Sequence, residues 1–434
     1  MNKVAFVTLG CKTNQYETDA LMDIFYKNRY EVVDFEDFSD IYVINTCTVT
    51  NMSDKKSRQM IRRAKKSNPE GLVVVVGCYA QISPDEVRAI EDVDIVIGTD
   101  SRSAIISYIE DYQAGLTEKP YVIVEDIMKI KVFEEMSVSS ITTHTRAFIK
   151  IQEGCNQYCT YCIIPYARGH VRSRSLSHIL DEIIALTHKG YVEFVLTGIH
   201  IGSYGLDLDD VSVIDLLEAI QKIEGVKRIR LGSIEPRLIN DDFINRIQPL
   251  DKLCDHFHLS LQSGSDSVLN RMNRKYTAEA FKGSVERLRS LYENPSLTTD
   301  IIVGFPGETD AEFEETMAFV GQIRFSEIHV FQFSKRVGTP AASMPDQVDS
   351  AVKKMRSEQL IALAQKLGDA YKKSFIGKQL ELLIEDQKGN EWLGHTKNYL
   401  KLSVVDSENT AKQGEIRSVI LKEVENEKII SQFA

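Results

Sequence analysis

Three cysteines lie within the eight residues Cys155-Asn156-Gln157-Tyr158-Cys159-Thr160-Tyr161-Cys162, directly after an apolar, strand-like run over residues 147–151. Three thiolates on one loop can hold three corners of a metal site, and soft sulfur ligands select zinc or an iron–sulfur cluster. Structural zinc needs a fourth protein ligand, and the nearest histidine, His170, is eight residues further on. The spacing therefore favours an iron–sulfur cluster with one iron open to a small molecule over a zinc knuckle.

Three further cysteines follow apolar runs in the first part of the chain. The runs over residues 4–9, 41–45 and 72–76 end beside Cys11, Cys47 and Cys78, and a fourth run covers residues 94–97. Their alternation with amphipathic helices predicts a doubly wound parallel α/β sheet over residues 1–115. Ligands bind at the carboxyl ends of the strands in such sheets. A single buried cysteine is a common core residue, but three at equivalent strand ends favour a second cluster.

A second series of strands and helices begins near residue 146. Six strand-like runs are separated by helical patterns, over residues 147–151, 193–196, 228–232, 256–261, 299–303 and 327–333. Six such units predict an incomplete (β/α)6 barrel over residues 144–370, with its active site at the carboxyl ends of the strands. Residues 116–143 show no clean periodicity and are expected to form a linker that contributes an edge strand at 121–124.

The last part of the chain has short alternating strands after a helical pattern over residues 351–375. This pattern predicts a small β-barrel of the oligonucleotide-binding kind over residues 371–434. Its acidic and basic residues balance, so RNA contact would come from one face, for example His395, Lys397, Tyr399 and Lys401.

The net charge of −11 argues against a general attraction to nucleic acid, so contact with RNA requires local basic patches. Residues 55–66 form one such patch, with seven basic residues and no acidic one on an apparent helix. A run of like charges costs stability, so a polyanionic partner explains it better than a solvated helix face. The residues expected to contact RNA are Arg62, Arg63, Lys65, Lys66, Lys397 and Lys401.

The composition also bears on the cellular compartment. No apolar run approaches the roughly 18 residues of a membrane-spanning helix, and seven cysteines are an odd count for a disulfide scaffold. The sequence predicts a cytoplasmic protein without membrane contact. Cys254 is expected to be structural, as are the histidines His200, His256, His258 and His329.

The cysteine loop, with Tyr161 just before the last cysteine, resembles the cluster loop of the radical S-adenosylmethionine enzymes. The resemblance implies a four-iron, four-sulfur cluster on Cys155, Cys159 and Cys162. In that family the open iron chelates S-adenosylmethionine, and electron transfer cleaves it to a 5′-deoxyadenosyl radical. The resemblance also implies that turns after the barrel strands hold this cofactor. The cofactor-binding residues expected on this basis are Tyr161, Gly198, Ser233, Glu235, Gln262 and Gly304.

The order of the three parts is similar to that of the methylthiotransferases, which combine a three-cysteine domain, a radical S-adenosylmethionine barrel and a TRAM barrel. In that family the first three cysteines, here Cys11, Cys47 and Cys78, bind a second four-iron, four-sulfur cluster that carries sulfur. The resemblance implies that one S-adenosylmethionine methylates this sulfur and a second yields the radical that takes hydrogen from an unactivated carbon. It also implies a reductant such as flavodoxin or ferredoxin and a sulfur donor.

The opening motif Leu9-Gly10-Cys11-Lys12-Thr13-Asn14 looks like one branch of that family. This branch adds the methylthio group to carbon two of N(6)-threonylcarbamoyladenosine in the anticodon arm of tRNA. The isopentenyladenosine branch tends to read Gly-Cys-Gln-Met-Asn here and the ribosomal-protein branch Gly-Cys-Pro-Lys-Asn, and both are alternatives. A non-enzymatic RNA-binding iron–sulfur protein is a third alternative, although it would need no glycine-rich nucleoside-binding turns.

Overall fold

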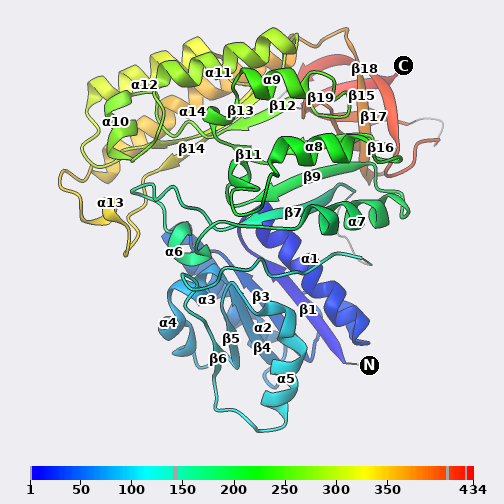
Figure 1. Cartoon of the computed structure of the whole chain (residues 1–434), viewed down its shortest axis with the longest axis vertical. Coiled ribbons are helices and arrows are strands. Elements are labelled where there is room, and N and C mark those ends of the chain that lie inside the picture. The colour runs from blue at the N-terminus through cyan, green and yellow to red at the C-terminus, as the bar shows by residue number, and fades with distance from the viewer. Residues whose placement is uncertain (1, 140–144, 407–409, 426–427) are drawn as a thin grey trace.

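The computed structural model of the chain describes residues 2–139, 145–406, 410–425 and 428–434. Figure 1 shows three parts: an N-terminal sheet with its helices, a central set of strands covered by helices, and a small C-terminal barrel beside that central part. This is the mixed α/β architecture expected from the sequence. No helix of the described residues is long and apolar enough to cross a membrane.

The N-terminal sheet is parallel throughout and has the strand order β2-β1-β3-β4-β5-β6. Strands β3 and β4 are buried along their whole length, which explains their continuous apolar sequence. The strand order reverses between β1 and β3, where an open α/β sheet has its ligand-binding crevice. The strands are β1 (Lys3–Thr8), β2 (Glu31–Val33), β3 (Ile41–Thr46), β4 (Leu72–Gly77), β5 (Ile95–Ile97) and β6 (Tyr121–Ile123).

Helices cover both faces of this sheet, as the doubly wound prediction requires. One apolar cluster lies between the sheet and helices α1 and α5, and a second lies between the sheet and helices α2, α3 and α4. Strand β2 was missed from the sequence because it is three residues long and only half-buried. The helices are α1 (Lys12–Lys27), α2 (Asn51–Ser67), α3 (Cys78–Ile82), α4 (Pro84–Arg88), η1 (Arg102–Ala104) and α5 (Ile105–Gln113).

The segment predicted as a linker contributes the edge strand that was expected from it, because β6 pairs with β5. The segment then runs toward the central part, and on the way the Tyr16 hydroxyl of α1 donates a hydrogen bond to the Met136 carbonyl (2.6 Å). The Val138 amide donates to Glu182 (2.8 Å). Residues 140–144 of this segment lie outside the described residues. The domain boundaries at residues 115, 143 and 370 stay predictions.

Two four-stranded sheets form the central barrel, in the orders β10-β9-β7-β8 and β11-β12-β13-β14. The predicted third strand is divided at Gly232 into β10 and β11, and a bridge between Ile229 and Leu253 joins β10 to the segment just before β12. Within the described residues no pairing joins β7 to β14, so the barrel is incomplete, as predicted. The strands are β7 (Ala147–Glu153), β8 (Arg172–Ser173), β9 (Glu193–Gly198), β10 (Arg228–Leu231), β11 (Ser233–Ile234), β12 (His256–Leu259), β13 (Ser296–Val303) and β14 (Glu327–Gln332).

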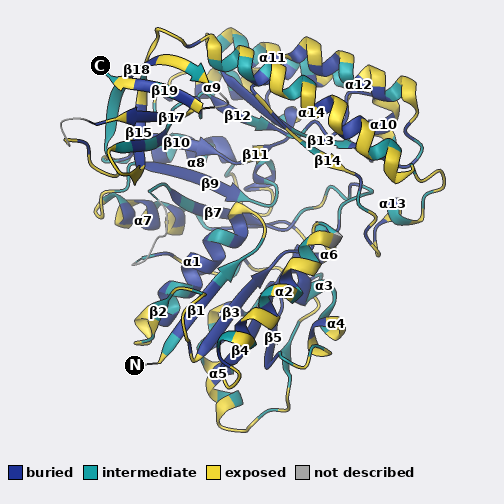
Figure 2. Ribbon diagram, turned by 180° about the vertical axis from the view of Figure 1, so that it is seen from behind, coloured by how far each residue is buried: buried dark blue, intermediate teal, exposed yellow. Residues whose placement is uncertain are grey.

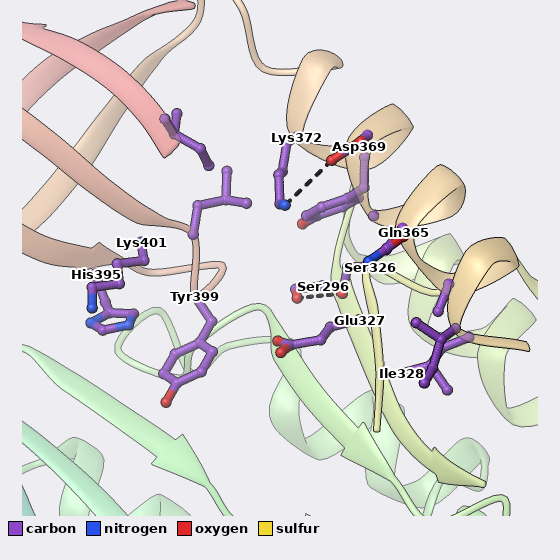
Figure 3. A pocket seen from close by; sticks show the side chains of 16 residues that line it. Ser296, Ser326, Glu327, Ile328, Gln365, Asp369, Lys372, His395, Tyr399 and Lys401 are labelled. Carbon is purple, nitrogen blue, oxygen red and sulfur yellow. Dashed lines mark hydrogen bonds and ion pairs between the residues drawn. The ribbon is translucent and has the colours of Figure 1, made fainter. Parts of the chain in front are cut away.

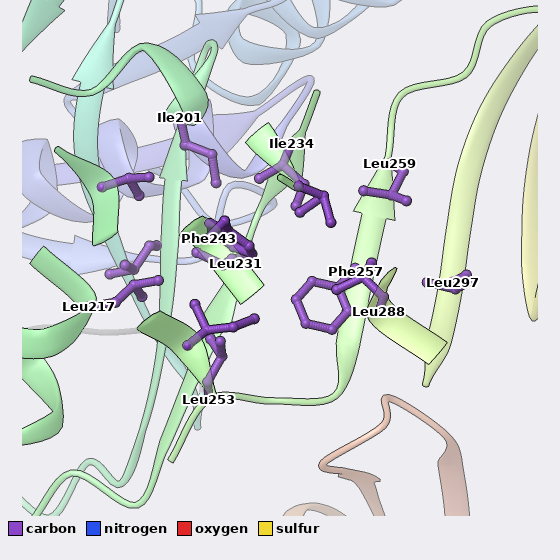
Figure 4. Packing of buried hydrophobic residues seen from close by; sticks show 14 of the residues in the cluster. Ile201, Leu217, Leu231, Ile234, Phe243, Leu253, Phe257, Leu259, Leu288 and Leu297 are labelled. Carbon is purple, nitrogen blue, oxygen red and sulfur yellow. The ribbon is translucent and has the colours of Figure 1, made fainter. Parts of the chain in front are cut away.

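Helices pack against the outside of these strands. The outer faces of the helices are exposed, whereas the strands other than the edge strand β14 are mostly buried (Figure 2). The main core lies between them, where Leu217, Phe243, Phe257 and Leu288 meet (Figure 4). The elements on this side are α6 (Ile164–Arg168), α7 (Leu176–Thr187), η2 (Ile201–Ser203), α8 (Val213–Gln221), η3 (Pro236–Leu238), α9 (Asp241–Ile247), α10 (Asp266–Arg271), α11 (Ala278–Leu291), α12 (Asp310–Ile323) and α13 (Pro340–Ser343).

The C-terminal part is a closed five-stranded barrel in the order β15-β16-β17-β19-β18, as predicted. Helix α14 (Ser350–Lys373) leads to it along the edge strand β14 of the central barrel. A core around Trp392 and Leu402 fills the barrel. The strands are β15 (Gln379–Lys388), β16 (Glu391–Thr396), β17 (Lys401–Val405), β18 (Ile416–Glu425) and β19 (Lys428–Phe433).

Candidate active site

The loop after β7 carries Cys155, Cys159 and Cys162, which we call the barrel triad. Backbone hydrogen bonds fix this loop: the Cys155 amide donates to the Gly169 carbonyl (3.0 Å) and the Thr160 amide to the Met272 carbonyl (3.1 Å). The loop is therefore held on one side by the end of α6 and on the other by the turn after α10. The carboxyl end of the first barrel strand is the place where the sequence predicted this loop.

A buried arginine lies against the barrel triad. The guanidinium of Arg274 donates to the Cys159 sulfur (3.2 Å), the Ser260 carbonyl (3.1 Å) and the Tyr276 hydroxyl (2.8 Å). A fixed cation beside sulfur favours the thiolate, which is the form that binds metal. Arg274 is a site residue that the sequence analysis missed, because no motif in the cysteine loop points to the turn after α10.

Burial makes free thiolates costly at the barrel triad. It raises the pKa of Cys155 to about 11 and that of Cys162 to about 12. A metal that takes the place of the proton removes this cost, because the ligand is then neutralised by the ion. The donor set therefore fits an iron–sulfur cluster better than free thiolates.

The second group of cysteines is Cys11, Cys47 and Cys78, which we call the sheet triad. They follow β1, β3 and β4, which are neighbours in the sheet, so their positions meet at the point where the strand order reverses. Gly10, with φ +117°, allows the close approach: a Cβ there would lie 2.9 Å from the Cβ of Cys47. The sequence prediction that these strand ends bring three thiols to one edge is thus matched by the strand order.

Arg168 connects the two triads. It ends α6, six residues after Cys162, and its Nε donates to the Cys78 sulfur (3.1 Å). Its other nitrogens donate to Asn14 (2.8 Å) and to the carboxylates of Glu17 and Glu153. Burial opposes ionisation of Glu17, but Arg102, Arg168 and Lys150 hold the pKa of Glu17 well below its usual range. The segment that carries the barrel triad therefore also supplies the cation beside the sheet triad.

Neither triad has the spacing of a single-ion site. Tetrahedral zinc with Zn–S bonds of about 2.3 Å would bring its sulfurs to roughly 3.8 Å from one another. Across the described residues, the one group of three candidate ligand atoms within 4.8 Å of one another is His258, Asp300 and His329. In neither triad do all three sulfurs lie within that distance of one another, so neither triad is arranged around a single zinc ion.

The residues predicted to hold the cofactor lie at the strand ends around the barrel triad. Glu235 follows β11, and burial opposes its ionisation, but the neighbouring His200 (3.7 Å), the hydrogen bond from Arg237 (2.6 Å) and the charge of Arg274 hold its pKa at about 2. Ser233 is exposed in β11. Gly198 ends β9, where a Cβ would lie 2.9 Å from the Gln152 carbonyl.

The remaining predicted cofactor residues come from the second sheet and the cysteine loop. Gln262 follows β12 with a φ of +70°, and its backbone bridges to β13. Gly304 follows β13, and its amide donates to Glu308 (2.6 Å). Tyr161 packs against an apolar cluster that includes Phe305 and Met272. These residues come from separate strands but surround the carboxyl ends of the barrel strands, where the resemblance expects the cofactor.

Comparisons with known proteins agree with this arrangement. Residues 149–320 match the Radical SAM superfamily, and residues 3–98 match the uncharacterized protein family UPF0004. A threonylcarbamoyladenosine tRNA methylthiotransferase, MtaB, from Bacillus subtilis is 48% identical over 408 residues, 93% of this chain and 90% of its own length. The chain belongs to the radical S-adenosylmethionine methylthiotransferase family. It is therefore an enzyme of a family that uses S-adenosylmethionine and a four-iron, four-sulfur cluster.

Two other proteins are similar to this methylthiotransferase, one in sequence and one in fold. A tRNA-2-methylthio-N(6)-dimethylallyladenosine synthase from Thermoanaerobacter pseudethanolicus is 38% identical over 388 residues, 87% of this chain and 81% of its own length. Among solved structures, the radical S-adenosylmethionine methyltransferase TsrM from Kitasatospora setae has a TM-score of 0.59 at 15% identity, and covers 79% of this chain and 77% of its own. At that identity the likeness shows the fold alone.

The basic side chains of helix α2 in this methylthiotransferase fall into two groups: some form ion pairs within the fold, and others are exposed. Lys65 pairs with Asp94 (3.2 Å) and donates to the Gly71 carbonyl (2.7 Å), so it stabilises the fold. Arg63 pairs with Glu36 on the surface. Arg62 and Lys66 are exposed and have no ion pair with a described residue.

The C-terminal face suggested for RNA is only partly open. Tyr399 stacks between His256 and His395, with ring centroids 4.5 and 4.8 Å apart, and so faces the central barrel. The rings of Tyr399 and His395 are thus half-buried, because they stack on one another and Tyr399 also stacks on His256 of β12. Lys397 donates to the Asp251 carbonyl (2.6 Å), whereas Lys401 is exposed.

A cavity of about 430 Å³ lies beside these rings, between α14, β14 and the C-terminal barrel (Figure 3). Its walls include Glu327, Lys372, Tyr399 and Lys401, and none of the six triad cysteines. The cavity is thus separate from the cysteine sites. Cys254, expected to be structural, is buried. The His258 Nδ1 lies 2.9 Å from the Thr298 hydroxyl, but His258 also belongs to the group with Asp300 and His329, so its structural role stays a prediction.

Proposed function

We propose that this enzyme adds a methylthio group to carbon two of N(6)-threonylcarbamoyladenosine beside the anticodon of tRNA, using two S-adenosylmethionines and two four-iron, four-sulfur clusters. The observation that carries the proposal is the contact of Arg168 with Cys78, because it joins the segment of the barrel triad to the sheet triad. The substrate branch is supported by the 48% identity to a methylthiotransferase named for threonylcarbamoyladenosine.

The two triads take different roles in this proposal. Cys155, Cys159 and Cys162 hold the cluster at which S-adenosylmethionine is cleaved, and Cys11, Cys47 and Cys78 hold the one that carries sulfur. When bound, these groups supply a carbon-based radical and a sulfur nucleophile. Such a radical is needed because an adenine C–H bond has no acidic proton that a general base could remove.

The chain's own contribution is placement and charge. Arg274 and Arg168 each donate a hydrogen bond to one cysteine sulfur, so each triad has a fixed cation that stabilises negative charge on its ligands. The carboxylate of Glu235, with its pKa of about 2, is ionised at neutral pH and can accept hydrogen bonds from a ribose or an amine. Because the enzyme holds the reactants in fixed positions, the reaction no longer depends on their encounter in solution, which accounts for a large part of an enzyme's rate enhancement.

The partners follow from the same proposal. The anticodon arm of tRNA is the substrate, Arg62, Lys66 and Lys401 are exposed cations that can contact its phosphates, and Arg63 is a further candidate. Lys65 and Lys397 are tied to the fold, which argues for a supporting role. A reductant such as flavodoxin or ferredoxin and a sulfur donor are the remaining partners.

We propose domains at residues 1–115, 144–370 and 371–434, with residues 116–143 as the linker.

The proposal is tested with two anticodon stem-loop RNAs that differ at one nucleoside, threonylcarbamoyladenosine or isopentenyladenosine. Reconstituted enzyme, reductant, sulfide and S-adenosylmethionine are incubated with each, and the nucleosides are analysed by mass spectrometry. We expect the methylthio product from the threonylcarbamoyl RNA. Product from the isopentenyl RNA alone would favour the second branch, to whose named member the chain is 38% identical. Lack of product from both RNAs would refute the tRNA substrate.

A further inference from the structure

The barrel interior contains a lysine next to the sheet triad. Lys12 follows Cys11 and begins α1, and its ammonium lies 5.8 Å from the ring centre of Tyr399 in the C-terminal barrel. Its side chain is accessible to solvent, and the guanidinium groups of Arg146 and Arg230 lie 5.3 and 4.7 Å from the centre of the same ring, so these cations line one water-accessible recess. The charged groups nearest to it are Arg146, Arg230 and Glu193.

The recess has more positive than negative charge. Arg228 and Arg230 both pair with the carboxylate of Glu193, at 3.4 and 2.8 Å, and Arg228 also lies 3.8 Å from the carboxylate of Glu381. Arg146 pairs with Glu385 (2.9 Å). For Lys12 no described carboxylate lies within ion-pairing distance. The Lys12 ammonium is therefore available to a ligand that carries a negative charge.

The position of α1 directs this lysine into the barrel. Helix α1 packs against β7 and β9, and the hydroxyl of Thr13 lies 3.5 Å from that of Thr197 in β9. Lys12 is therefore between a cysteine of the sheet triad, Cys11, and the ring of Tyr399. A substrate base that meets the sulfur at the sheet triad would extend its substituents toward this recess.

On the basis of the function proposed above, we propose that the ammonium of Lys12 binds the carboxylate of the threonine moiety of the substrate nucleoside. Threonylcarbamoyladenosine carries that carboxylate on N6, and one ring nitrogen separates carbon two from the carbon that bears N6. The isopentenyl group is apolar and has no charge to pair with Lys12. Lys12 is thus a specificity-determining residue for the modified base.

The competing source of negative charge is an RNA phosphate. A phosphate contact would strengthen binding of every anticodon stem-loop by the same factor, whatever the base carries. A carboxylate contact strengthens only the RNA that has the free acid. A charge-assisted hydrogen bond contributes about 1.5–3 kcal/mol, which corresponds to a roughly ten- to hundredfold preference.

The test measures equilibrium binding of three anticodon stem-loops, carrying threonylcarbamoyladenosine, its threonine methyl ester or unmodified adenosine. Wild-type enzyme is compared with the Lys12→Gln and Lys12→Arg variants. Lys27→Gln, at the opposite end of α1, is the matched control. We expect wild type, Lys12→Arg and Lys27→Gln to prefer the free acid at least about tenfold, and Lys12→Gln to bind all three RNAs alike.

Three results would overturn the proposal: a Lys12→Gln variant that keeps the preference, one that weakens all three RNAs equally, or a wild type that does not distinguish acid from ester. Product analysis on the same RNAs separates this failure from failure of the proposed function. Methylthiolation of the threonylcarbamoyl RNA by an enzyme without the preference would leave the function intact and remove only the role of Lys12.

Discussion

The two cysteine triads are built in opposite ways. The barrel triad lies on one loop of eight residues, and backbone hydrogen bonds to two neighbouring segments hold it. The sheet triad gathers three residues spread over residues 11–78, and it exists only when β1, β3 and β4 are neighbours. The first site is a property of local sequence, whereas the second is a property of the sheet's strand order.

The triads also differ in where their neighbouring cations come from. Arg274, beside Cys159, belongs to the same barrel as its triad. Arg168, beside Cys78, comes from the other domain, and so does Arg336, which donates to Thr48 next to Cys47 (2.6 Å). The surroundings of the sheet triad are therefore complete only when the barrel is docked on the N-terminal sheet.

The largest effect is expected from the barrel triad. Replacing Cys155, Cys159 and Cys162 together by alanine should lower the iron content of reconstituted protein from about eight to about four per chain. It should also abolish cleavage of S-adenosylmethionine, because the remaining cluster does not bind that cofactor. Iron analysis and quantification of 5′-deoxyadenosine check this. Cleavage at the wild-type rate would show that the triad is not the cofactor site.

A smaller effect is expected from replacing Gly154, the residue directly before the cysteine loop. Gly154 has a φ of +71°, and a Cβ there would lie 1.8 Å from the His170 carbonyl oxygen, a backbone atom that cannot rotate away. Gly154→Ala should lower the free energy of unfolding by roughly 2–6 kcal/mol, from backbone strain and overpacking. Denaturant unfolding of the apo protein measures it.

The control for that substitution is Gly321→Ala in α12, where a Cβ meets nothing within 4 Å. This change should stabilise the protein by about 0.5–1 kcal/mol, since alanine is a better helix former than glycine. Equal effects of the two substitutions would contradict the claim that the cysteine loop is locally constrained.

The smallest effect is expected on RNA binding. Lys55, Arg62 and Lys66 share one face of α2 by their spacing of seven and four residues, and all three are exposed. Changing them to glutamine should reduce the salt dependence of tRNA binding, by about 0.7–0.9 in the log–log slope for each phosphate that the variant no longer neutralises. Binding titrations at several salt concentrations measure that slope.

The same charge change made at Lys189, Lys222 and Lys227, which are exposed on the central barrel, is the control and should leave the slope unchanged. An unaltered slope in the α2 variant would mean that the basic helix is a solvated face. The C-terminal barrel would then be the place to look for RNA contacts.

The sequence predicted what depends on local patterns. The loop spacing, the continuous apolar strands β3 and β4 and the six barrel strands were all predictable, since each follows from the residues themselves. Strand β2 and the break at Gly232 were not, because they are too short to leave a periodic pattern. The sheet triad was predictable only through a rule about where ligands bind in α/β sheets.

Contacts between domains could not be predicted from sequence. Arg168 and Lys12 contact residues far away in the chain, and nothing in their local sequence indicates the partner. The run over residues 55–66 was correctly expected to be a helix. Its basic side chains are not all available to a partner, however, because Lys65 forms an ion pair with Asp94. Tyr399 is a similar case, because its ring faces another domain.

The division of labour between the triads is tested most directly by one variant in which Cys11, Cys47 and Cys78 are all alanine. Its production of 5′-deoxyadenosine and of methylthio nucleoside is measured in the same reaction with threonylcarbamoyl RNA. We predict that 5′-deoxyadenosine is still formed from S-adenosylmethionine, because the barrel triad is intact, while no methylthio nucleoside appears. Methylthio product at the wild-type rate would contradict the account, since the sheet triad would then have no part in sulfur transfer.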